Sequence, residues 1–101
     1  MKEKIYDIKR GPYPKKYTAV VRNNKTRKCR KINFGDVRYQ QYRDRTKLGY
    51  YSSKNHNTIK RMRNYYKRHS GTKFRNVAIS CEKKRSNGYY NAKILSHKYL
   101  W

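Results

Sequence analysis

Positive charge is the feature that most limits how this chain can fold. Lys and Arg number 29 against five Asp and Glu, which gives a formal net charge of +24 over 101 residues. The two halves of the chain, residues 1–50 and 51–101, each carry +12, so the charge does not belong to a basic tail. Two like charges about 10 Å apart in water repel by roughly 0.4 kcal/mol before screening, and a compact fold must overcome many such repulsions.

The apolar side chains available to oppose this repulsion are few. Ile, Leu, Val and Phe make up only 15 of the 101 residues, a share at which highly charged chains are usually disordered. Twelve tyrosines and one tryptophan argue the other way, because disordered chains contain few aromatic residues. We therefore expect a small folded domain that depends on tyrosine for part of its core and on an acidic partner to neutralise its charge.

Several broad classes of protein are excluded by the sequence. The longest run of aliphatic residues is Ala19–Val21, so no membrane-spanning segment is expected. Met1–Lys4 leads into no apolar stretch, which argues against a secretory signal. Cys29 and Cys81 are the only cysteines, and free thiols in a reducing compartment are expected rather than a disulfide.

The first third of the chain predicts an extended arm followed by a β-hairpin. Two prolines and a glycine favour a stiff extended arm over residues 1–16. β-branched residues on both sides of a turn-forming sequence, Asn23–Thr26, indicate strands over residues 16–22 and 27–34.

The remainder predicts a tyrosine-rich irregular loop over residues 35–53 and then short helices. Three helices are expected, each bounded by residues that commonly start or stop a helix: Asn55 or Asn57 to Gly71, Thr72 to Ser86, and Asn91 to Trp101. The second helix would bury a face formed by Phe74, Val77, Ala78 and Cys81. The expected fold is therefore α+β, with residues 17–101 forming one small domain.

A succession of short motifs resembles a known family. In chain order the motifs are Ile32-Asn33-Phe34-Gly35, Ser53-Lys54-Asn55-His56 opening a basic helix, Tyr65-Tyr66-Lys67-Arg68-His69-Ser70-Gly71, and Asn91 to Trp101. This order resembles a family of small basic proteins of unknown function from large nucleocytoplasmic DNA viruses of the mimivirus and phycodnavirus kind, over about residues 15–101. The resemblance implies a setting, which is a giant virus, its factory or its particle, and assigns no catalytic or binding residue.

Basic side chains gather in three clusters on three predicted elements. The clusters are Arg27, Lys28, Arg30 and Lys31 in the hairpin, Lys60, Arg61, Arg63, Lys67 and Arg68 in the first helix, and Lys83, Lys84 and Arg85 in the second. Such clusters either neutralise an acidic partner or form solvated faces. Because so few acidic residues balance them, the sequence favours a partner, which can be nucleic acid phosphates or an acidic protein surface.

The aromatic residues divide into core and interface candidates. The expected core tyrosines are Tyr17, Tyr66 and Tyr99, and the expected interface aromatics are Tyr39, Tyr42, Tyr50 and Tyr51 in the loop, with Trp101 at the chain terminus. Trp101 either packs back on the first long helix or inserts into a neighbouring molecule. The tyrosines beside arginines could also stack on unpaired bases.

The residues needed for catalysis or metal binding are sparse. The five carboxylates form no close pair along the chain, and the three histidines and two cysteines lack the spacing of metal ligands. We therefore expect no enzyme, no catalytic residue, no metal and no cofactor.

The leading hypothesis for function is a structural protein of a giant DNA virus particle. It would be a minor capsid component that cements acidic surfaces of the major capsid protein or of other minor capsid proteins, in a virion assembled in the viral factory of the host cytoplasm. The alternative is a sequence-independent protein that binds and condenses viral DNA. A ribosomal or ribonucleoprotein component also fits the composition, and the family resemblance alone argues against it.

Overall fold

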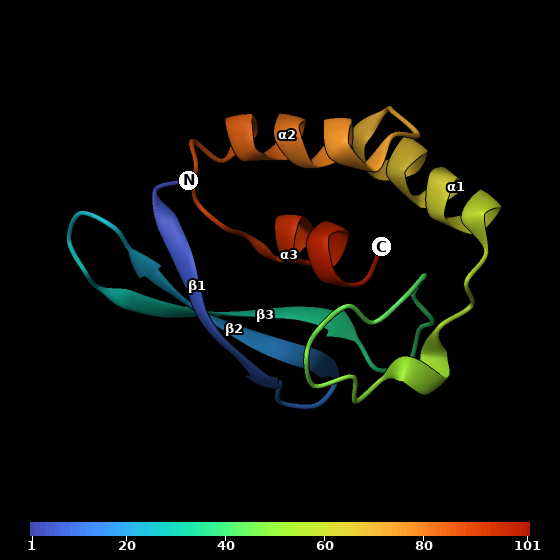
Figure 1. Ribbon diagram of the computed structural model, residues 1–101, viewed down its shortest axis with the longest axis horizontal. Coiled ribbons are helices and arrows are strands. Elements are labelled where there is room, and N and C mark those ends of the chain that lie inside the picture. Colours follow the sequence, from blue (N-terminus) through green and yellow to red (C-terminus); the bar gives the residue numbers. More distant parts are fainter.

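The computed structural model describes all residues from 1 to 101 and is built in three layers (Figure 1). A three-stranded antiparallel sheet forms the first layer, one helix lies on its face, and two further helices run end to end above that helix. The elements are β1 (Glu3–Arg10), β2 (Lys15–Asn23), β3 (Cys29–Asp36), the short 3-10 helix η1 (Ser52–Lys54), α1 (Ile59–Ser70), α2 (Arg75–Arg85) and α3 (Ala92–Tyr99). The predicted α+β fold class is therefore confirmed.

The predicted hairpin is part of a larger sheet, because the N-terminal segment is a strand and not a free arm. β2 is the central strand and pairs antiparallel with β1 on one side and β3 on the other. The register of β1 shifts between Ile5 and Asp7, so that Ile5 and Ile8 both face the core despite lying three residues apart. This bulge breaks the alternation that identifies a strand in sequence, which is why the prediction of an extended arm over residues 1–16 was wrong.

A tight turn at Gly11–Pro14 connects β1 to β2. The backbone N–H of Gly11 donates to the carbonyl of Lys16 at 3.0 Å, and that of Lys15 donates to the carbonyl of Pro12 at 2.8 Å. A Cβ at residue 11 would lie 3.0 Å from the backbone of Tyr17, so only glycine fits here. The residues predicted to stiffen a free arm therefore fold the chain back on itself.

The main core lies between the sheet and α3. Tyr17, Ala19 and Val21 project from one face of β2 and are fully buried against α3 and the residues that follow it. On the helical side the buried residues are Ile94, Leu95 and Leu100. Because β2 is covered by strands on both edges and by α3 on this face, it is the most protected part of the fold.

A second, smaller core joins α1 to α2. It consists of Tyr65 and Tyr66 from α1 and Ala78 from α2. Trp101 packs against both cores and so connects the upper helices to the sheet layer. The predicted burial of Tyr17 and Tyr66 is confirmed, and Tyr99 is partly buried against the main core.

Two of the predicted helix ends are confirmed. Gly71 ends α1 in the left-handed conformation with φ of 69°, and Asn91 caps α3 by accepting a hydrogen bond from the backbone N–H of Ile94 at 2.8 Å. The caps predicted at Asn55, Asn57 and Thr72 are wrong, because α1 and α2 begin after Thr58 and Phe74. The side chain of Asn55 is instead engaged within the loop before α1.

The buried face predicted for α2 is also wrong. Of its four predicted residues only Ala78 is buried, whereas Phe74, Val77 and Cys81 are exposed. α2 contacts α1 and α3 only, and the small side chain of Ala78 lets the helices approach closely. Val77 of α2 and Phe74 just before it therefore face solvent, while Ile79 is partly buried.

The packing of α3 yields a matched test of core stability. Ile94→Ala removes a side chain that is 0% exposed, whereas Ile59→Ala removes one that is 51% exposed on another helix. We expect Ile94→Ala to lower the free energy of unfolding by about 2–5 kcal/mol, and Ile59→Ala to change it by about 0.5 kcal/mol or less. Urea denaturation followed by circular dichroism measures both. Equal effects would show that α3 does not form the core.

Candidate partner-binding surfaces

The long segment between β3 and α1 is held in place by hydrogen bonds of Gln41, which is fully buried. Its side-chain N–H groups donate to the carbonyl of Tyr51 and to Oδ1 of Asn55, both at 2.7 Å. Its Oε1 accepts a hydrogen bond from the ammonium group of Lys16, which also donates to the carbonyl of Tyr39 at 2.8 Å. Burial lowers the pKa of Lys16 to about 8, and this lysine is part of the scaffold rather than of any binding surface.

Asp44 is the second centre of this network. Its carboxylate accepts hydrogen bonds from the hydroxyl of Tyr17, the hydroxyl of Thr46 and the backbone N–H of Tyr51. Burial, together with the hydrogen bond to Asp44, raises the pKa of Tyr17 to about 12. The network thus ties the irregular segment to the central strand β2 and determines which of its tyrosines reach the surface.

Two of the four loop tyrosines predicted as interface residues are exposed. Tyr39 is 65% exposed and Tyr50 is 47% exposed, with the guanidinium of Arg10 lying 4.3 Å from the ring centre of Tyr50. Tyr51 is partly buried against the main core. The prediction for Tyr42 is wrong, because its side chain is only 6% exposed and no partner can reach it.

Trp101 packs back onto α1, which was one of the two alternatives for the chain terminus. Its ring stacks on that of Tyr65, with centroids 4.2 Å apart and an angle of 4° between the planes, and it lies 5.2 Å from the ring of His56. This contact stabilises the protein itself. Trp101 is only partly buried and also lines a concave surface beside Tyr39, so its role as an interface aromatic stays a prediction.

Hydrogen bonds of His97 link α3 to α1. Its Nδ1 lies 2.8 Å from the hydroxyl of Tyr65 and its Nε2 lies 3.3 Å from the hydroxyl of Ser70. Its backbone carbonyl accepts a hydrogen bond from Tyr66 at 3.0 Å. Burial, and then the positive charge of Lys93, lower the pKa of His97 to about 4, so the imidazole is neutral at physiological pH.

One residue of the basic cluster in the hairpin, Arg30, forms hydrogen bonds within the fold. Arg30 donates two hydrogen bonds of 2.8 Å to the buried carboxylate of Glu3 and one of 2.5 Å to the carbonyl of Tyr90. Arg30 thus contributes to the fold while its side chain stays 48% exposed, and its assignment as a partner-binding residue stays a prediction. Arg27, Lys28 and Lys31 are exposed and form no ion pair.

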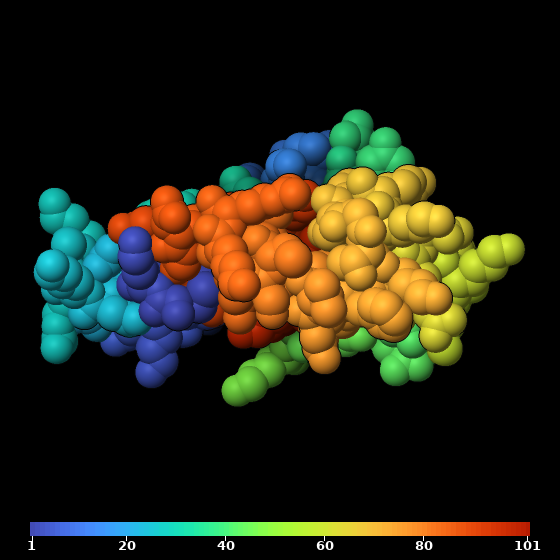
Figure 2. All heavy atoms as spheres, turned by 90° about the horizontal axis from the view of Figure 1, so that it is seen from above, coloured from blue at the N-terminus to red at the C-terminus, as the bar shows by residue number.

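The basic cluster of α1 lies entirely on the surface. Lys60, Arg61, Arg63, Lys67 and Arg68 are all exposed on this helix, which Figure 2 shows in yellow beside α2 in orange. Three of them, together with Asn64 and Lys73, line a shallow groove of about 540 Å³ in which Ile59 is the only apolar residue. No carboxylate lines this groove, so it is suited to an anion.

The basic cluster at the end of α2 is less open. Lys84 and Arg85 are exposed, while Lys83 is partly buried. Lys83 contributes, after burial, to lowering the pKa of Lys98 on α3. Positive charges are thus crowded on both sides of the α2–α3 contact.

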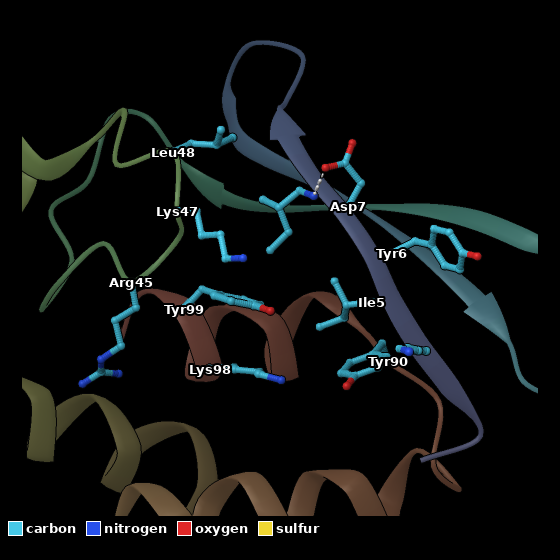
Figure 3. A pocket seen from close by; sticks show the side chains of 11 residues that line it. Ile5, Tyr6, Asp7, Arg45, Lys47, Leu48, Tyr90, Lys98 and Tyr99 are labelled. Carbon is cyan, nitrogen blue, oxygen red and sulfur yellow. Dashed lines mark hydrogen bonds between the residues drawn. The ribbon is translucent and has the colours of Figure 1, made fainter.

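A cavity of about 630 Å³ opens between β1, residues 45–48 and α3 (Figure 3). Apolar side chains line it from several segments, namely Ile5 and Ile8 of β1, Leu48 of the loop, and Tyr90 and Tyr99 at the two ends of α3. Lys4, Arg45, Lys47 and Lys98 bring four positive charges to the same cavity. The sequence contains no signal for this site, because its residues come from three distant parts of the chain and share no motif.

The remaining features concern metal ligands, thiols and membrane spans. No group of three or more His, Cys, Asp or Glu side chains lies close enough together to hold a metal ion, and Cys29 and Cys81 are exposed free thiols. The longest helix has 12 residues, and none has the length and hydropathy to cross a membrane. No protein-family model, curated protein or solved structure matches this chain.

The buried His97 predicts a loss of stability in mild acid. The unfolded chain takes up a proton near pH 6.5, whereas folded His97 does so only near pH 4, so protonation favours unfolding between these values. We expect the free energy of unfolding to fall by about 2–3 kcal/mol over this range, since one pKa unit corresponds to about 1.4 kcal/mol. Urea denaturation at several pH values measures the fall, and NMR titration assigns it to His97.

The exposed His69 supplies the control for this prediction. His69→Gln should retain most of the loss of stability between pH 6.5 and pH 4, because burial is the main cause that lowers the pKa of His97 and the charge of His69 is a lesser one. An NMR titration of His97 with a midpoint near 6.5 would contradict the prediction.

Proposed function

We propose that this protein is a non-catalytic structural protein of a giant DNA virus particle, a minor capsid component that binds acidic surfaces of the major capsid protein or of other minor capsid proteins. The observation that carries the proposal is the number of free positive charges on a well-packed fold. Only three of the 29 Lys and Arg side chains form an ion pair, with Glu3, Asp36 and Glu82 as the acidic partners. Of the other 26, Lys16 is buried in the scaffold, and the cations that lie on the surface remain available to an acidic partner.

The acidic residues support the same proposal, because the fold uses them internally. Asp44 holds the tyrosine loop, and Asp7 accepts a hydrogen bond from the backbone N–H of Ile8 at 2.9 Å. The other three are in ion pairs, so Asp7, which is exposed, is the only carboxylate without a side-chain partner, and one isolated carboxylate offers little for catalysis or metal binding. Binding, not catalysis, is the activity that these surfaces favour.

The exposed tyrosines support the proposal that the surface around them binds a protein partner. Tyr39 lies beside Arg38, whose guanidinium is 5.9 Å from the ring centre, and Tyr50 lies under Arg10. Tyrosine and arginine are the residues that most often anchor protein interfaces, since they combine apolar area with polar groups. In the proposed assembly the free cations pair with acidic capsid residues and these two tyrosines fill pockets in the partner.

The groove on α1 favours a second candidate function, which is sequence-independent binding and condensation of viral DNA. Lys60, Arg63, Lys67 and Lys73 line it, and neighbouring phosphates could bind such a row of cations without recognition of the bases. A protein of this kind would bind any duplex, with an affinity that falls steeply as salt concentration rises.

Tyrosine substitutions separate the two functions. We expect Tyr39→Ala to weaken binding to the purified major capsid protein by about tenfold or more, because truncation of an interface anchor typically costs over 1 kcal/mol. Binding to a random-sequence DNA duplex should be unchanged, since the net charge is the same. Surface plasmon resonance over a series of salt concentrations measures both affinities.

A matched control comes from Tyr13, which is 81% exposed in the β1–β2 turn. Tyr13→Ala should leave both affinities unchanged within about twofold. Tight, salt-sensitive binding to the duplex with no binding to capsid protein would overturn the capsid proposal and establish DNA condensation in its place.

A further inference from the structure

We propose that the cavity between β1, residues 45–48 and α3, called here the β1 cavity, binds an extended acidic segment of the partner protein. An apolar side chain of the segment would enter the cavity, and its flanking carboxylates would pair with the basic residues at the rim. The inference rests on the proposed function, because it specifies which kind of capsid segment the protein holds.

The first argument is that apolar side chains line much of the cavity. Figure 3 shows Ile5, Leu48 and Tyr99 around a single space between the three segments. All three are only partly buried against the main core, so each keeps apolar surface facing the opening. A volume of about 630 Å³ is in the range of sites that hold small ligands or a few side chains, and filling it would bury this apolar surface.

The second argument is the uncompensated charge at the rim. Lys4, Arg45, Lys47 and Lys98 form no ion pair. The only carboxylate lining the cavity is that of the exposed Asp7, which offsets no more than one of these four charges. Four cations around one opening repel each other, and carboxylates of a partner would remove this repulsion.

Positive charges that lie outside the cavity add to the crowding at two of the rim residues, Lys98 and Arg45. Burial and then the positive charges of Lys83 and Arg75 lower the pKa of Lys98. Burial and then the charge of Arg75 lower the pKa of Arg45. A bound carboxylate would stabilise the charged form of both side chains.

The third argument is the position of β1 at the edge of the sheet. β1 pairs with β2 on one side only, so its other edge has no partner strand and borders the cavity. Side chains of an extended segment alternate between two faces. A segment lying along β1 could therefore place one residue in the cavity and the next at the basic rim.

Charge and shape argue against the other occupants. A second copy of this chain carries +24 and would be repelled by the rim, and the bulge and lysines of β1 further disfavour pairing between copies. Single-stranded nucleic acid binds by stacking its bases on aromatic rings. Tyr6, Tyr90 and Tyr99 line the cavity, but Ile5, Ile8 and Leu48 add branched aliphatic surface, which suits an apolar protein side chain better than a base. An acidic protein segment with an apolar side chain matches both the apolar lining of the cavity and the basic residues around its opening.

The test uses the full chain and synthetic peptides. A fluorescently labelled acidic peptide with leucine at alternate positions is compared with the same peptide carrying serine in place of leucine, and with oligo-dT of equal charge. We expect the leucine peptide to bind about tenfold more tightly than the serine peptide, because only the leucine peptide buries apolar surface in the cavity. Fluorescence anisotropy measures the three affinities.

Two variants of the cavity and two matched controls locate the binding site. Leu48→Ser should weaken binding of the leucine peptide by about tenfold and leave the serine peptide unaffected. Lys47→Glu should weaken the leucine peptide much more than Lys67→Glu, which makes the same charge change on α1. Ile59→Ser, which removes an exposed isoleucine of α1, should have no effect. Because Lys47 is exposed, its substitution tests the site even if Leu48→Ser alters the loop.

Equal affinities for the leucine and serine peptides, or equal losses in Lys47→Glu and Lys67→Glu, would overturn the proposal. Tighter binding of oligo-dT that depends on Lys47 would assign the cavity to nucleic acid instead. A different result would overturn the proposed function. If the peptide binds in the cavity but the protein does not bind capsid protein, the capsid function is wrong and the cavity still binds acidic segments. Capsid binding that is lost in Tyr39→Ala and unaffected by Lys47→Glu would overturn only the role of the cavity.

Discussion

The hydrogen-bond network around Gln41 and Asp44 is the constraint on which the rest of the structure depends. It attaches the irregular segment between β3 and α1 to the central strand through Lys16 and Tyr17, without the aliphatic residues that usually perform this task. Buried polar groups are costly unless they are fully paired, and here they are paired with one another. Through this network the segment presents Tyr39 and Tyr50 to solvent and places Leu48 beside the β1 cavity.

The acidic and basic residues of this protein have separate roles. Its few carboxylates are used inside the fold, as in the contact of Glu3 with Arg30 and with the backbone N–H of Tyr90, which joins β1 to the start of α3. The excess of cations is left on the surface, where water and salt screen their repulsion. The α1 groove and the β1 cavity are two of the places where these cations surround a concave surface, and they are lined by different kinds of side chain.

Local signals in the sequence predicted much of the fold. Asn91 and Gly71 mark helix ends because a cap or a left-handed residue acts within one turn of the helix, and the turn after Asn23 acts over an equally short range. The same local reasoning failed for β1, where a bulge breaks the alternation, and for α2, whose apolar residues face solvent. It also assigned Tyr42 to a surface, because burial depends on partners distant in the chain.

The sequence by itself determined the α+β class, the excess of positive charge and the dependence of the core on tyrosine, since these follow from composition and from spacing along the chain. Only the tertiary structure decided which cations are free, which tyrosines are exposed and where a cavity opens. Ile5, Leu48 and Tyr99 lie far apart in sequence, and packing of α3 against the sheet brings them together. Concave surfaces arise from such long-range packing, which no local pattern of residues encodes.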